Sequence, residues 1–170
     1  FLSVFVFSVF VLSSCSLYES DMQFNPASAK EIFIQAIANN TNKPGLESKI
    51  TLAISEEMQN DGRLIIANSQ DVSDGALSII IKRYILRPLT YDANMVAEQY
   101  KLWVVFEVAF TDTESGEEKW KEDMEIIQIY LDANKSGVEE GEGLTEDQAQ
   151  DAVSEKLARR ITRRIIKGYI

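Results

Sequence analysis

The feature that most constrains this chain is a strict alternation of side chains from residue 100 to residue 111. Large apolar or aromatic side chains occupy every second position: Tyr100, Leu102, Val104, Phe106, Val108 and Phe110. Successive side chains of a strand point to opposite faces of a sheet, so this period predicts a long β-strand with one buried face. One strand cannot cover that face alone, and the chain must supply further strands and a covering layer.

Apolar runs between turn residues predict the other strands. The run at 77–86 contains three consecutive isoleucines, which is typical of a central strand that is apolar on both faces. A loop is expected around residues 88–98, where Pro88 interrupts the pattern. The remaining predicted strands are 32–37, 64–67 and 120–131.

Two segments have helical spacing. Apolar residues three and four positions apart predict a helix over 46–58, which ends at Asp61-Gly62. Thr145 and Gln148 form a capping-box pattern that opens a second, long helix ending near Gly168. The order β-α-β-β-β-β-α predicts an α+β fold, a two-layer sandwich. Its mostly antiparallel sheet of four to five strands would carry both helices on one face.

The N-terminus has the character of an export signal. Residues 1–14 are almost wholly apolar and end in small residues before Cys15, as a lipoprotein signal peptide does. We expect 1–14 to be a signal that lacks its own first residues, 15–30 a lipidated tether, and 31–170 a single domain. Two alternatives are a cleaved signal followed by an incidental cysteine, and a transmembrane anchor, for which the apolar run is short.

Composition argues against several functions. The net charge of −10 disfavours nucleic acid, whose binding depends on neutralised phosphates. The chain has no histidine, and Cys15 is its only cysteine, so neither a catalytic triad nor a disulfide is expected. The acidic residues lack the spacing of a calcium loop. We therefore expect no enzymatic activity, no metal and no other cofactor.

The basic residues gather at the end of the chain. Complementing the dipole of the second helix is the simpler interpretation of this cluster, and a binding patch is the alternative. Its members are Lys156, Arg159, Arg160, Arg163, Arg164 and Lys167.

The second face of the predicted sheet is not wholly polar. Trp103 and Val105 project from it, and large apolar groups on such a face often mark a partner or ligand surface. Alternatively, they are isolated surface residues, or the loop 132–144 covers them.

A series of short motifs then follows the order found in one family. They are N-x-T at 39–41, P-G-L-E at 44–47, D-G-R at 61–63, P-L-x-Y-D at 88–92 and K-W at 119–120. In their order and spacing the chain resembles the outer-membrane lipopolysaccharide-assembly lipoproteins of the LptE family. Departures such as Gln35 and Ile37 in the first strand, and Ser16 after Cys15, are those of a distant member.

The resemblance implies a non-enzymatic protein held in the outer membrane by a lipid on Cys15, with its domain on the periplasmic side. Its expected partners are the outer-membrane β-barrel LptD, which it plugs and helps to assemble, and lipopolysaccharide. A lipoprotein scaffold of another secretion or peptidoglycan-linked complex, without a lipid ligand, is the alternative.

Lys82, Arg83 and Arg87 are the expected lipopolysaccharide-binding residues, because phosphates require basic partners. Simple alternation places Lys82 on one face and the two arginines on the other, so the three share a site only if the strand bulges. Arg87, nearest the predicted loop, is the first choice. Ordinary solvated strand residues are the alternative reading.

Overall fold

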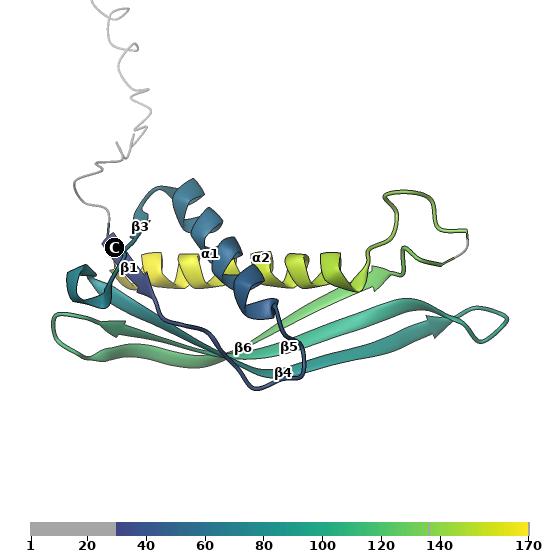
Figure 1. Cartoon of the computed structure of the whole chain (residues 1–170), viewed down its shortest axis with the longest axis horizontal. Helices are drawn as coiled ribbons and strands as arrows, with labels where there is room; N and C mark the ends of the chain where they lie inside the picture. Colours follow the sequence, from purple (N-terminus) through teal and green to yellow (C-terminus); the bar gives the residue numbers. More distant parts are fainter. Residues whose placement is uncertain (1–29, 136, 170) are drawn as a thin grey trace, which may run out of the picture.

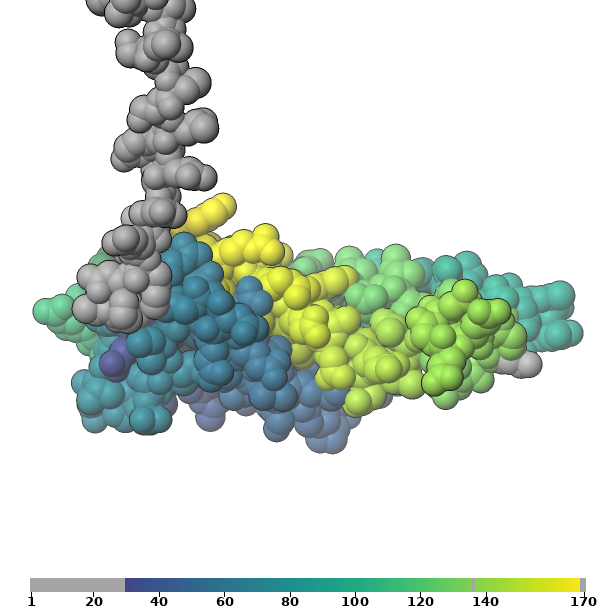
Figure 2. Space-filling model, turned by 90° about the horizontal axis from the view of Figure 1, so that it is seen from above, coloured from purple at the N-terminus to yellow at the C-terminus, as the bar shows by residue number. Residues whose placement is uncertain are grey.

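The computed structural model describes residues 30–135 and 137–169. Both helices lie on one face of a long, twisted sheet (Figure 1), and seen from above they cover its middle (Figure 2). In chain order the elements are β1 (Lys30–Ile34), β2 (Ala38–Asn39), α1 (Leu46–Asp61), β3 (Leu64–Ile66), the 3-10 helix η2 (Gln70–Val72), β4 (Gly75–Tyr91), β5 (Ala97–Asp112), β6 (Glu118–Leu131) and α2 (Glu146–Tyr169).

The sheet has six strands in the order β3-β1-β4-β5-β6, with β2 also paired to β4. The three long strands β4, β5 and β6 are antiparallel, whereas β1 runs parallel to β3 and β4, and β2 runs parallel to β4. The predicted α+β sandwich with both helices on one face is confirmed. The strand predicted at 32–37 ends at Ile34, and a separate two-residue strand, β2, follows residues 35–37.

Alternation in β5 sets the position of the core. Phe106 and Phe110, on the helix side of β5, are fully buried. From α1 the buried side chains are Leu46, Ile50, Ile54 and Met58. From α2 the fully buried apolar side chains are Ala149, Val153, Leu157, Ala158, Ile161 and Ile165. The core of the described domain therefore lies between the sheet and the two helices, as the helical spacing predicts.

The start of α2 and the end of α1 also lie where the sequence predicts them. At the start of α2, the Thr145 N–H donates to Gln148 Oε1 (2.8 Å) and the Gln148 N–H donates to Thr145 Oγ1 (3.2 Å), which is the reciprocal capping box. At the end of α1, Gly62 has φ 77° and its N–H donates to the Met58 carbonyl. In the described ranges, neither helix is long and apolar enough to span a membrane.

The prediction of a loop around residues 88–98 is wrong for most of these residues, which belong to strands. β4 continues to Tyr91 and β5 begins at Ala97, with Pro88 opposite Tyr100. A proline argues against a central strand because it has no N–H to donate. Beyond Ile81, however, β5 is the only strand among residues 30–135 and 137–169 that pairs with β4. This half of β4 is thus an edge, where a missing donor is tolerated, and the hairpin extends beyond the helices (Figure 1).

Candidate functional site

The face of the sheet opposite the helices, here called the open face, has no layer of described residues over it (Figure 1). Because Leu102 and Val104 lie in the core, the alternate β5 residues Trp103 and Val105 lie on the open face, where the alternation places them. Val105 is only 7% exposed, because its neighbours surround it. Trp103 is partly buried.

Loop 132–144 does not cover these residues. It turns toward the helix side of the sheet (Figure 1), where Leu144 packs against the core. The Leu144 N–H donates to the Leu131 carbonyl (2.8 Å), which fixes the return of the chain. On the open face, Ile127 and Ile129 remain 41% and 53% exposed.

A β-bulge at Lys82 determines where the predicted basic residues point. Ile81 pairs with Phe106 and Arg83 with Val105, so Lys82 is an extra residue in β4. Lys82 Nζ lies 3.0 Å from Asp123 Oδ1 on the open face. The bulge therefore brings Lys82 onto the same face as Arg83, which simple alternation excludes.

Arg87 shares this face, since it pairs with Lys101 of β5. The structure thus brings the three predicted basic residues to one face of one strand. They differ in their partners, however. Lys82 pairs with Asp123 and Glu107, and the hydrogen bond to Asp123 raises the pKa of the Lys82 ammonium. Arg83 and Arg87 have no ion-pair partner among residues 30–135 and 137–169.

The charges next to Lys82 neutralise one another. Glu107 Oε1 lies 2.7 Å from Lys121 Nζ, and this hydrogen bond lowers the pKa of the Glu107 carboxyl. Together with Lys82 and Asp123, these residues form a closed set of two acids and two bases. The uncompensated positive charge of the open face therefore lies farther along β4, around Arg87.

A hollow lies beside Arg87. It encloses about 240 Å³ and is lined by Ile85, Arg87, Pro88, Leu89, Lys101 and Trp103. Lys101 Nζ stands 5.6 Å from the centre of the Trp103 ring, a cation–π distance. The Trp103 Nε1–H is buried without a hydrogen-bond acceptor, which is unusual for a buried donor. The hollow therefore offers apolar walls and cations at its rim.

Lys101 is the residue that motif reasoning missed. Its signal was nevertheless present in the sequence, because the alternation of β5 puts Lys101 and Trp103 on the same face. The apolar surface also continues from Trp103 to Ile127, its partner on β6, and to Ile129, opposite Lys101. We call the hollow and its cations, together with these two isoleucines, the Arg87 surface.

Two expectations fall outside this geometry. Cys15 lies outside the described residues. In the part of the chain that the structure describes, no three acidic or cysteine side chains come together in a metal-binding arrangement.

Solved structures of bacterial proteins share this fold, and two of those described next are lipoproteins. The rare lipoprotein B of Shewanella oneidensis aligns with a TM-score of 0.51 and 17% identity, over 81% of this chain and 95% of that one. Lipoprotein B of Nitrosomonas europaea aligns with a TM-score of 0.51 and 13% identity, over 81% of this chain and 82% of that one. A hypothetical protein of Chlamydia trachomatis aligns with a TM-score of 0.55 and 9% identity, over 81% of this chain and 95% of that one. At these identities the likeness establishes the fold alone.

The family follows from the sequence itself. The model of the lipopolysaccharide-assembly family LptE matches residues 29–167, which is nearly the whole described domain. The chain belongs to the LptE family, as the motif order predicted. A search among curated proteins gives no match.

Proposed function

We propose that this protein is a lipid-anchored LptE component of lipopolysaccharide assembly. In this role it would join the outer-membrane barrel LptD, assist its assembly and contact lipopolysaccharide in transit, without enzymatic activity. The lipid on Cys15 would hold it to the outer membrane with the domain on the periplasmic side. Family membership supports the general role, and the chemistry of the Arg87 surface supports the ligand.

The observation that carries the ligand assignment is the group of unpaired cations beside an apolar hollow. Lipopolysaccharide has phosphates next to acyl chains, so a binder needs both kinds of contact. Arg87 and Lys101 at the rim suit the phosphates, while Trp103 and the apolar walls suit the first carbons of an acyl chain.

Arg87→Glu is expected to weaken binding of purified lipopolysaccharide about ten-fold or more. This follows because a charge-assisted contact of roughly 1.5–3 kcal/mol is replaced by repulsion. Arg87 is exposed, so stability should change by less than about 0.5 kcal/mol. Binding by the parent should also fall with added salt. Titration with the lipid at two salt concentrations, and thermal unfolding of both proteins, measure these quantities.

Lys119→Glu is the matched control. It makes the same charge change at an exposed position at the far end of β6, where Lys119 pairs with Glu117. Its binding should equal that of the parent. If Arg87→Glu binds as tightly as the parent, Arg87 is not a contact. If an Arg83, Arg87 and Lys101 triple glutamate variant does so too, the Arg87 surface is not the lipid site.

The apolar part of the open face is the proposed contact with the barrel. Val105 offers little area, so the contact would fall to Trp103 and to the exposed Ile127 and Ile129 of β6. An Ile127→Glu/Ile129→Glu variant should lose a co-purifying β-barrel from detergent-solubilised membranes, because charges would be buried in an apolar contact. Leu52→Glu on α1, at 60% exposure, is the control. If the parent brings down no barrel, the protein acts in another envelope complex.

A further inference from the structure

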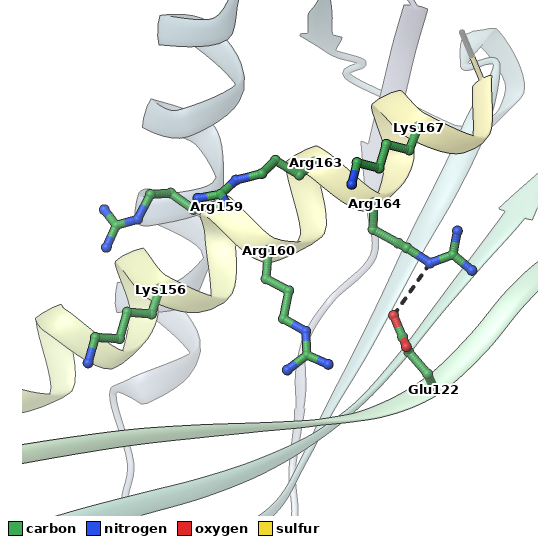
Figure 3. A pocket seen from close by; sticks show the side chains of 7 residues that line it. All are labelled: Glu122, Lys156, Arg159, Arg160, Arg163, Arg164 and Lys167. Carbon is green, nitrogen blue, oxygen red and sulfur yellow. Dashed lines mark ion pairs between the residues drawn. The ribbon is translucent and has the colours of Figure 1, made fainter.

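Between residues 156 and 167, the exposed side of α2 consists of cations alone. From residue 156 to residue 167, every residue that is not buried is Lys or Arg, within a chain of net charge −10. The side chains fan out from one side of the helix above β6 (Figure 3). We call this the α2 basic face, and its members are Lys156, Arg159, Arg160, Arg163, Arg164 and Lys167.

The helix dipole accounts for little of this face. Its field acts within about the last turn of a helix, and only Lys167 lies in the last turn of α2. Lys156 lies three turns earlier, where a cation gains nothing from the helix C-terminus. The dipole interpretation therefore explains one of the six residues, and the binding-patch alternative gains support.

Neighbouring acids compensate only two of the six cations. Arg159 pairs with Glu155 (3.5 Å) and Arg164 with Glu122 (3.6 Å), both at long distances. Lys156 Nζ donates to the Ile127 carbonyl (3.0 Å), which leaves its charge uncompensated.

Arg160, Arg163 and Lys167 have no ion-pair or hydrogen-bond partner within the described ranges. Three like charges within two turns repel one another unless an anionic surface lies against them. An anionic partner would relieve this repulsion, so the α2 basic face is suited to binding one.

The tether favours a membrane as that partner. β1 begins at Lys30 at the same end of the molecule as the C-terminal end of α2 (Figure 1). Cys15 lies fifteen residues before Lys30, a span of at most about 50 Å when fully extended. If Cys15 carries the lipid, as proposed above, the α2 basic face stays within reach of a bilayer surface.

The shape and composition of the face also suit headgroups. Together with Glu122 of β6, its side chains line an open hollow of about 480 Å³, and their cationic ends diverge instead of converging on one small anion (Figure 3). The face exposes no apolar residue between 156 and 167, so contact would be electrostatic, without insertion. A single lipid anchor joined to a basic patch is a known way to make membrane attachment stable.

We propose that the α2 basic face binds the anionic phospholipid headgroups of the membrane to which the protein is tethered. Because α2 covers the opposite side of the sheet, this contact leaves the open face and the Arg87 surface free. The lipid and the α2 basic face together would fix the orientation of the domain as well as its location.

Vesicle flotation tests the proposal with the chain from residue 15 carrying Cys15→Ala, which removes the acyl group. Core residues run from Ile32 to Ile166, so this chain retains the whole core. The probes are phosphatidylcholine vesicles with and without about one-third phosphatidylglycerol. We expect binding at least ten-fold tighter to the anionic vesicles at about 0.05 M salt, and release at about 0.5 M salt.

Arg160→Gln/Arg163→Gln/Lys167→Gln should weaken this binding at least ten-fold, because each cation near an anionic surface contributes to attachment. The matched control is Arg63→Gln/Lys119→Gln/Lys121→Gln, which changes the net charge equally at exposed sites elsewhere and should bind as the parent does.

Three results would overturn the proposal: equal binding of the parent to neutral and anionic vesicles, unchanged binding by the α2 variant, or an equal loss in the control. Loss of an acidic envelope protein by the α2 variant, with no vesicle binding by the parent, would instead make the face a protein site. Arg87→Glu should not affect flotation. A failure here is thus distinct from a failure of the lipopolysaccharide site.

Discussion

Replacing Cys15 with Ala is expected to move the protein from the membrane fraction to the aqueous fraction in a high-salt wash. No helix in the described part of the chain can span a membrane. Each methylene of an acyl chain contributes roughly 0.8 kcal/mol when buried in lipid, so the lipid proposed on Cys15 would be the strongest attachment and its loss should release the protein. High salt is needed because it would also release the membrane contacts proposed for the α2 basic face. Phase partitioning in detergent measures the change.

The variant should be exported behind a conventional cleavable signal, so that the apolar residues 1–14 are not retained as an anchor. Ser16→Ala is the control and should stay in the membrane fraction. Ser16 is not Asp, the usual signal for retention in the inner membrane, so the parent should fractionate with the outer membrane. A Cys15→Ala protein that resists the high-salt wash must have another anchor.

Phe106→Ala is expected to reduce the free energy of unfolding by about 3–5 kcal/mol. Phe106 lies in the middle of β5, is fully buried and faces the helices, so its removal leaves a cavity between the two layers. A domain of this size has a total stability of about 5–15 kcal/mol, so most of it is at risk. Urea denaturation followed by circular dichroism measures the loss.

Ile129→Ala provides the comparison on the other face of the sheet. Ile129 is 53% exposed on β6, and its truncation should cost less than about 1 kcal/mol. Similar losses in the two variants would contradict the assignment of one buried and one open face. Phe106→Leu, which keeps most of the volume, should lie between them.

The long helices and strands could be predicted from the sequence. The features that depend on contacts between distant segments could not. Alternation identified β5 and its buried face without ambiguity. It did not distinguish a loop from an edge strand at Pro88, because that depends on whether another strand pairs with β4. The parallel pairing of β1 with β3 and β4 was equally hidden, since strands of three to five residues have too few side chains to indicate direction.

For the Arg87 surface, the sequence indicated the residue types and only part of their arrangement. Trp103 was placed on its face by period alone. From the sequence, a bulge in β4 was only a requirement for the three basic residues to share a face. The sequence could not show that it exists at Lys82, because a bulge depends on how β4 pairs with β5. The neutralisation of Lys82 by Asp123 depends on a residue two strands away. That contact reveals why Arg83 and Arg87, and not Lys82, remain available.

The edge half of β4 has a consequence for crowding on a membrane. Proteins with exposed strand edges risk joining edge to edge into polymers. Here Pro88 lacks the N–H that a neighbouring strand would need, and the Lys82 bulge interrupts the ladder. β6 is the other long edge strand. There the Lys156 side chain donates a hydrogen bond to the Ile127 carbonyl, and the Gln128 side chain donates one to the Ile129 carbonyl. An apolar face can therefore stay exposed for a partner while the edges resist self-association at high surface density.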